Sequence, residues 1–138
     1  MLFSDIRGFT SMSEQLPVTE IAELLSHYLR EASGPIERER GRVMKVMGDG
    51  RMGVSGPDAA GEVAAPAAAA LRAGQGIVEA AQRFRQWIAR RNDVPGLPPF
   101  EVGVGIHTGE IMLFHLAVGS TGDLFDHLGP MDCVAFTG

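Results

Sequence analysis

KVMGDGRMGV, residues 45–54, is the stretch that says most about how this chain folds. It contains a tight turn between two apolar segments, and Asp-Gly is a favoured pair in β-hairpin turns. We therefore expect strands over residues 42–47 and 51–55, joined at Gly48-Asp49-Gly50. Upstream, FSDIRGFT at residues 3–10 predicts a buried strand over residues 1–6 that Gly8 ends. Each motif places one aspartate, Asp5 or Asp49, at a strand end beside flexible backbone.

The region between these motifs has the pattern of a helix. Thr10 and Ser13 are candidate caps of a short helical piece, and Thr19 is the candidate cap of a longer one. Its apolar residues recur at i, i+3, i+4, i+7 and i+8, the spacing of an amphipathic helix; they are Ile21, Leu24, Leu25, Tyr28 and Leu29. Gly34-Pro35 predicts a kink or an interruption near its end, and Gly41 predicts its stop.

A second long helix is expected over residues 67–91, with Pro66 in its first turn. Its expected buried positions are Leu71, Ile77, Val78, Phe84, Trp87 and Ile88. Alternating residues predict a strand over 100–108 and a partner over 110–116, followed by a loop over 117–126 and the start of a helix over 131–137. Strands, helices and a hairpin in this order indicate an α+β sandwich, with helices on one face of an antiparallel-rich sheet.

Bulk properties set limits on the function. The chain has 138 residues and a formal net charge of −5. This length predicts one domain over residues 1–138, and the charge argues against coating nucleic acid or an anionic membrane. The single Cys133 excludes an internal disulfide and fits a reducing, cytoplasmic compartment. No apolar run reaches the roughly 18–20 residues of a spanning helix, so we expect membrane attachment only through missing flanking segments.

Asp5 and Asp49 are the best candidates for chemistry. A hard dication is held by a few carboxylates with positions left for water and phosphate. Two such carboxylates on neighbouring strands could hold two ions about 3.5–4 Å apart, the arrangement that serves phosphoryl and nucleotidyl transfer. The structural alternative is that Asp5 caps a turn and that Asp49 is a type I′ turn residue. Four scattered histidines and one cysteine give no zinc pattern.

The two aspartate motifs resemble the catalytic domain of class III nucleotidyl cyclases, the adenylyl and guanylyl cyclases. The resemblance covers residue 2 to about residue 111 and includes FSDIRGFTSMSE, KVMGDGRMGV and VGVGIHTGE in family order. It implies a ferredoxin-like βαββαβ core similar to polymerase palm domains, here truncated at both ends. It also implies two Mg²⁺ or Mn²⁺ ions bound by Asp5, Asp49 and the carbonyl of Ile6, with ATP or GTP as substrate.

The same resemblance implies roles for five further residues. Gly8, Phe9 and Thr10 precede a helix, and the family uses this segment to bind phosphates. Lys45 matches a lysine that reads adenine in the family, because an ammonium only donates and adenine N1 only accepts. Its even offset from Asp49 predicts that both lie on one strand face. Asp126 is the candidate second adenine contact. The structural alternatives are a capped helix start, a solvated strand lysine and a plain loop aspartate, and His107 is expected to be structural.

The sequence departs from the family beyond Met112. Family members carry an asparagine and, four residues later, an arginine that stabilises charge developing on the phosphates. Counting from Asp126, Cys133 and Thr137 stand at these positions, and neither can do that job. Family sites form between two subunits packed head to tail, so a homodimer of this chain would have metal sites without that arginine, unless another cyclase domain supplied it.

We therefore expect an adenylyl cyclase catalytic domain that converts ATP to 3′,5′-cyclic AMP and pyrophosphate, with weak or absent activity in this chain alone. The alternative is an inactive cyclase-homology module that binds nucleotide or acts in regulatory dimerisation. A diguanylate-cyclase or polymerase-like palm shares the two-metal chemistry, but no GGDEF-type signature occurs in the sequence.

Overall fold

The computed structural model describes residues 1–55, 64–90, 99–109, 111–116 and 131–136. The chain divides into two compact units, Met1–His107 and Thr108–Gly138. The expectation that residues 1–138 form one domain stays a prediction. Among the described residues, none of the helices has both the length and the apolarity that a bilayer span requires.

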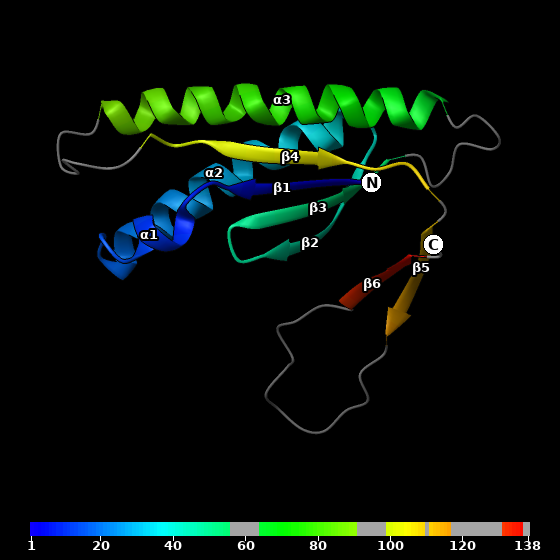
Figure 1. Ribbon diagram of the computed structural model, residues 1–138, viewed down its shortest axis with the longest axis horizontal. Coiled ribbons are helices and arrows are strands. Elements are labelled where there is room, and N and C mark those ends of the chain that lie inside the picture. Colours follow the sequence, from blue (N-terminus) through cyan, green and yellow to red (C-terminus); the bar gives the residue numbers. More distant parts are fainter. Residues whose placement is uncertain (56–63, 91–98, 110, 117–130, 137–138) are drawn as a thin grey trace. The chain divides into compact units, whose positions relative to one another are not determined.

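The first unit contains four strands and three helices in the order β1 (Leu2–Ile6), α1 (Phe9–Ser13), α2 (Val18–Arg38), β2 (Arg42–Met47), β3 (Gly50–Val54), α3 (Ala64–Ala89) and β4 (Val102–Ile106). The strands form one antiparallel sheet in the order β2-β3-β1-β4, with β1 between its two neighbours (Figure 1). Apart from the short α1, this is the predicted ferredoxin-like βαββαβ topology, which is therefore confirmed.

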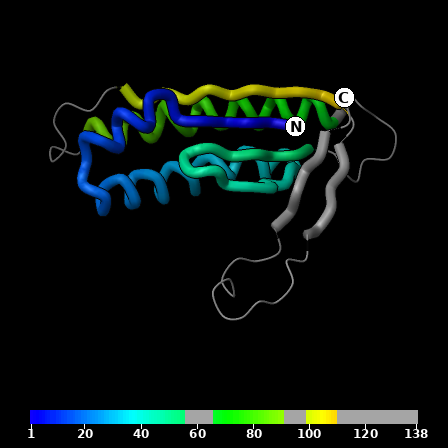
Figure 2. The backbone as a smooth tube through the Cα atoms, turned by 60° about the horizontal axis from the view of Figure 1, so that its bottom comes forward, coloured from blue at the N-terminus to red at the C-terminus, as the bar shows by residue number. Residues whose placement is uncertain are grey.

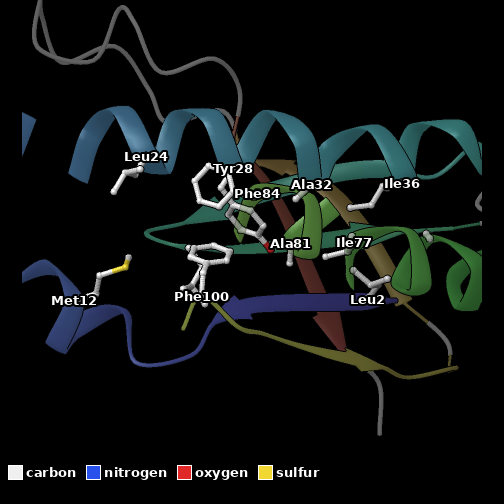
Figure 3. Close-up of a cluster of buried hydrophobic side chains, with 12 residues drawn as sticks. Leu2, Met12, Leu24, Tyr28, Ala32, Ile36, Ile77, Ala81, Phe84 and Phe100 are labelled. Atoms are coloured by element: carbon white, nitrogen blue, oxygen red, sulfur yellow. The ribbon is translucent and has the colours of Figure 1, made fainter. Parts of the chain in front are cut away.

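Both long helices run along the sheet and pack against each other (Figure 2). The alternation of β1 shows which face they cover, because Leu2, Ser4 and Ile6 are buried whereas Asp5 is exposed. Side chains from β1, α2 and α3 and from Phe100 meet in one hydrophobic cluster (Figure 3). Within it, the rings of Tyr28 and Phe100 pack edge to face with centroids 5.0 Å apart. The helices of the first unit therefore pack on the face opposite the one that carries Asp5.

Helix α2 continues through Pro35 to Arg38, so the predicted interruption at Gly34-Pro35 is wrong. Pro35 removes one backbone donor, but its ring is buried against α3 at a glycine. A Cβ on Gly76 would lie 2.8 Å from the Cβ of Pro35, so the bare backbone of α3 makes room for the proline ring. This packing compensates for the lost hydrogen bond near the helix end.

The predicted helix boundaries need further corrections. Helix α1 begins after Gly8, which has a left-handed conformation with φ of 67°, and α2 begins after Pro17, so none of Thr10, Ser13 and Thr19 is an N-cap. Ser13 instead donates a side-chain hydrogen bond to the Thr10 carbonyl.

The burial predicted for α3 is partly wrong. Ile77 and Phe84 are buried, but Leu71 is 57% exposed and Val78 is 41% exposed. The helix buries a face rich in alanine instead, which includes Ala73, Ala80 and Ala81. Ile77 and Phe84 share this buried face with the alanines, whose small side chains let the backbone of α3 approach its neighbours closely.

The second unit contains β5 (Ile111–Leu116) and β6 (Met131–Phe136), which pair antiparallel from Ile111↔Phe136 to Leu116↔Met131. The helix predicted over residues 131–137 is therefore wrong. Cys133 lies on β6 opposite Phe114, because a six-residue ladder of backbone hydrogen bonds forms there instead. Asp126 and Thr137 lie outside the described residues.

Candidate functional site

The β2–β3 turn places Asp49 beside the end of β1. Met47 pairs with Gly50, so the two turn residues are Gly48 and Asp49, rather than the Asp49-Gly50 pair expected from the sequence. Gly48 has φ of 60°, a conformation that glycine adopts without strain. Asp49 is thus held at the tip of a short turn.

Asp5 approaches this turn from β1. A Cβ on Gly50 would lie 3.3 Å from Asp5 Oδ1 and 3.2 Å from the Ser4 carbonyl oxygen. The carboxylate of Asp5 therefore lies against the backbone directly after Asp49, where a larger residue than glycine would crowd it. Two residues 44 positions apart in the sequence are brought together by the pairing of β1 with β3.

The two carboxyl groups interact directly. Burial raises the pKa of Asp49, and the negative charge of Asp5 and a hydrogen bond with its carboxyl group raise it further. Backbone N–H groups of Asp49 itself and Ile6 act in the opposite direction, because they donate to the carboxylate. Two facing carboxylates repel each other when both are ionised, and a divalent cation between them removes that repulsion.

These residues fit a hard dication in their chemistry. Carboxylates are acceptor-only when ionised, and they stand beside the backbone of Ile6, whose carbonyl is the third predicted ligand. Within the described residues there is no cluster of three or more His, Cys, Asp or Glu side chains. Any ion held here would therefore keep several positions for water or phosphate oxygens.

A buried polar cluster lies on the other face of the same two strands. Ser4 and Arg51 are directly opposite each other on β1 and β3, and they are 5% and 6% exposed. Tyr28 of α2 lies near both. Its hydroxyl and Arg51 Nε are buried with no hydrogen-bond partner among the described residues.

The charges of Asp5 and Asp49, on the other face of the sheet, also affect the pKa of Tyr28 in this cluster. Burial raises the pKa of Tyr28 to about 12, with a contribution from the charges of Asp5 and Asp49, while Arg51 and Ser4 lower it. Sequence reasoning did not find this cluster. The available signal was a serine and an arginine at inward-facing positions of otherwise apolar strands.

The predicted phosphate-binding segment follows Asp5 directly. Gly8 precedes α1, and Phe9 and Thr10 form its first turn. The Gly8 carbonyl accepts from the Met12 N–H, while Thr10 is exposed and Phe9 packs against the core. The segment is therefore close to the aspartates along the chain, and its role toward phosphate stays a prediction.

Lys45 is exposed on the edge strand β2, opposite Met52. The register shifts between Val43 and Lys45, and β2 ends at Met47. The shift lies before Lys45, and from Lys45 to Met47 the pairing is regular: Lys45 is opposite Met52, which is opposite Phe3 on the face of β1 that carries Asp5. Because Asp49 belongs to the turn, the shared face of Lys45 and Asp49 stays a prediction. The other predicted adenine contact, Asp126, is outside the described residues.

The finding on β6 also changes the argument about the missing asparagine and arginine. Counting along a helix led to Cys133 and Thr137, but Cys133 is on a strand. The count therefore does not identify the residues that stand at those positions. His107 donates its backbone N–H to the Met1 carbonyl and extends the β1–β4 pairing, and the structural role expected for its side chain stays a prediction.

Comparisons with known proteins agree with the fold and the two motifs. A family model described as the adenylate and guanylate cyclase catalytic domain matches residues 1–130. An adenylate cyclase of Anabaena cylindrica is 33% identical over 113 residues, which are 82% of this chain and 21% of that protein.

Two solved structures are similar over 98% of this chain. They are the adenylyl cyclase CyaB from P. aeruginosa, with 28% identity and a TM-score of 0.79, and the guanylyl cyclase Cya2, with 29% identity and a TM-score of 0.77. This chain covers 63% and 61% of those two chains, and about a fifth of the Anabaena protein.

Proposed function

The chain belongs to the family of adenylate and guanylate cyclase catalytic domains, and from this premise we propose that it binds ATP and converts it to 3′,5′-cyclic AMP and pyrophosphate. The observation that carries the proposal is the meeting of Asp5 and Asp49, which come from different elements and face each other. Such a pair is costly in a protein without a cation and useful in one that handles a triphosphate.

We propose the following roles for the residues of the site. Asp5, Asp49 and the Ile6 carbonyl hold two Mg²⁺ or Mn²⁺ ions. Bound there, the ions supply a lowered pKa for the ribose 3′-hydroxyl and charge neutralisation for the phosphates. Backbone N–H groups from Gly8 to Thr10 orient the phosphates.

ATP is favoured over GTP by one residue. The ammonium of Lys45 donates to an acceptor and cannot accept from a donor, which suits adenine N1 rather than the N1–H of guanine. The Anabaena relative is named an adenylate cyclase, whereas the two solved structures include one enzyme of each kind at nearly equal identity. The proposal of ATP therefore rests on Lys45, with Asp126 as a second contact to the adenine.

We further propose that two such domains pair head to tail, as a homodimer or with another cyclase domain, and that they act in the cytoplasm. Each site in this arrangement takes residues from two subunits, and weak or absent turnover of the 138-residue chain alone stays an expectation from its departure from the family beyond Met112. The alternative is a nucleotide-binding module without activity.

Calorimetry with Mn²⁺ and ATP tests the binding step, and cyclic AMP formation in the same samples tests turnover. We expect Mn²⁺-dependent ATP binding that Asp5→Asn and Asp49→Asn abolish. Glu79→Gln is the matched control, because Glu79 is an exposed carboxylate on α3. Binding without any product would favour the inactive module, and ATP binding that ignores both aspartate substitutions would refute the two-metal site.

A further inference from the structure

Arg7 is the cation closest in sequence to Asp5, and it directly follows β1, the strand that carries Asp5. Its backbone N–H donates to the Glu101 carbonyl at 2.9 Å, which continues the β1–β4 pairing beyond Ile6↔Val102. Arg7 is therefore held beside β4 before the chain turns at Gly8 into α1.

The position of Gly103 shows where the Arg7 side chain lies. Gly103 of β4 pairs with Asp5 of β1, so a Cβ on Gly103 would project from the same face of the sheet as the Asp5 side chain. That Cβ would lie 3.9 Å from Nη2 of Arg7. The guanidinium thus lies over the bare backbone of Gly103, next to Asp5 on the exposed face.

This guanidinium is available to an external anion. The ion pairs found within the described residues join Arg72 to Glu39 and Arg83 to Glu31, and Arg7 is in neither. Arg7 is also exposed. A guanidinium that stands beside a carboxylate without pairing with it has all of its donors free for phosphate oxygens, which it can bind in a bidentate manner.

We propose that Arg7 is a substrate-binding residue that contacts the triphosphate of the nucleotide held at Asp5 and Asp49. The inference rests on the proposed function and adds a contact from this chain's own β1–α1 turn. It adds a cationic side chain to the proposed site of a chain whose net charge is −5. The absence of a side chain at Gly103 leaves the space that Arg7 occupies.

The competing explanation is that Arg7 serves only as a counter-ion that offsets the charge of Asp5 before the cations bind. The two explanations predict different binding behaviour. A phosphate contact affects ATP and leaves adenosine and Mn²⁺ alone unchanged. A counter-ion affects Mn²⁺, because its removal strengthens the attraction of the carboxylates for the cation.

The experiment is calorimetry of the 138-residue chain with Mn²⁺ alone, with adenosine, and with ATP at saturating Mn²⁺. We expect Arg7→Gln to weaken ATP binding about tenfold to a hundredfold, because it removes a charge-assisted hydrogen bond. Affinity for Mn²⁺ alone and for adenosine should not change. Arg7→Lys should recover part of the ATP affinity, since a lysine keeps the positive charge but cannot bind two phosphate oxygens in the bidentate manner of a guanidinium.

Gly103→Val tests the same contact by a different route, because the new side chain occupies the place of the guanidinium. Its effect should match that of Arg7→Gln, and the double variant should be no weaker than either single one. Gly105→Val is the matched control. Gly105 lies two residues after Gly103 on β4, on the same face, and pairs with Phe3 of β1. A Cβ on Gly105 would have no neighbour within 4 Å.

Unchanged ATP affinity in Arg7→Gln, with or without tighter Mn²⁺ binding, would overturn the proposal and leave the proposed function standing. An equal loss for adenosine and ATP would also overturn it, because a phosphate contact cannot affect adenosine. Failure of the unsubstituted chain to bind ATP with Mn²⁺ would overturn the proposed function and this inference together.

Discussion

The negative charge of Asp5 acts on Asp49 and helps to raise its pKa, although the two residues belong to the end of a strand and to a neighbouring hairpin turn. The antiparallel pairing of β1 with β3 brings them together, and Gly50 lets Asp5 Oδ1 approach the turn closely. The arrangement is unfavourable when both groups are ionised, so the protein carries an electrostatic cost at the place where we propose that cations bind.

The first prediction concerns the pH dependence of stability. Burial and the charge of Asp5 raise the folded-state pKa of Asp49, so ionisation of this group costs stability as pH rises from its unfolded pKa through its folded pKa. Asp49→Asn should therefore be more stable than the unsubstituted chain at pH 7. The gain should be under about 1 kcal/mol, because Asp5 is exposed and Asp49 is only partly buried, so water screens the interaction.

Urea denaturation at pH 7 and at pH 3 measures this difference, which should be smaller at the lower pH because the raised pKa of Asp49 favours its neutral form there. Glu79→Gln serves as the control for loss of one negative charge. A stability gain for Asp49→Asn of equal size at both pH values would show that repulsion from Asp5 is not its cause.

The second prediction concerns Tyr28, whose hydroxyl is buried without a hydrogen-bond partner in the described part of the chain. Its folded pKa is raised to about 12, while an unfolded tyrosine titrates near pH 10, so stability is lost as pH rises from 10 to 12. This loss amounts to at most about 3 kcal/mol for a shift of this size. Tyr28→Phe should remove it.

Thermal unfolding of both proteins from pH 9 to pH 12 tests this prediction, because the difference between them isolates Tyr28 from other alkaline titrations. Near pH 7, Tyr28→Phe should be neutral or slightly stabilising, because it removes a buried polar group that has no partner. Parallel stability curves over the whole alkaline range would contradict the buried position of this hydroxyl.

Individual residues show which parts of the fold could be predicted from the sequence. Turn chemistry and strand alternation are local signals, and they led to an α+β sandwich; the βαββαβ topology came from the resemblance to the cyclase family. The course of α2 through Pro35 could not be predicted, because it depends on Gly76 of a helix 41 residues away. Tertiary packing there outweighs the local preference of proline.

The site was predictable to the same limited extent. Asp5 and Asp49 were found because each lies in a recognisable local motif. The Ser4–Arg51–Tyr28 cluster and the position of Arg7 over Gly103 were missed, because both depend on which residues face each other across strands. The alternation argument for Lys45 ends at Met47, because β2 ends there and Asp49 belongs to the turn.

The third prediction tests the contact between α2 and α3. Gly76→Ala would place a Cβ 2.8 Å from the Cβ of Pro35, so we expect destabilisation of about 1–3 kcal/mol, as for other overpacked sites. Gly34→Ala is the matched control, because its nearest neighbour would be an arginine nitrogen at 3.8 Å. It should stabilise α2 by about 0.5–1 kcal/mol. Chemical denaturation measures both, and equal effects would contradict the close approach.

The fourth prediction concerns the choice of nucleotide. Lys45→Glu replaces a donor by an acceptor, which suits the N1–H and amino group of guanine and leaves adenine N1 without a partner. We expect ATP affinity to fall about tenfold and GTP affinity to rise, measured by calorimetry with Mn²⁺. Lys45→Met is the control, since it should weaken ATP binding without improving GTP binding. Equal affinities for both nucleotides in all three proteins would exclude Lys45 from the purine site.

The last prediction tests the proposed head-to-tail pairing. In this arrangement, one subunit supplies Asp5 and Asp49 to a site and its partner supplies Lys45. Both sites of an Asp49→Asn homodimer are then defective, and so are both sites of a Lys45→Glu homodimer. A mixed dimer then has one site with both defects and one with neither. Random pairing of equal amounts should restore about one quarter of the ATP-binding capacity of the unsubstituted protein, because half of the dimers are mixed and one of their two sites is intact. Calorimetric stoichiometry measures this fraction. A mixture that binds no more ATP than its two components separately would mean that Asp49 and Lys45 serve the same site within one chain.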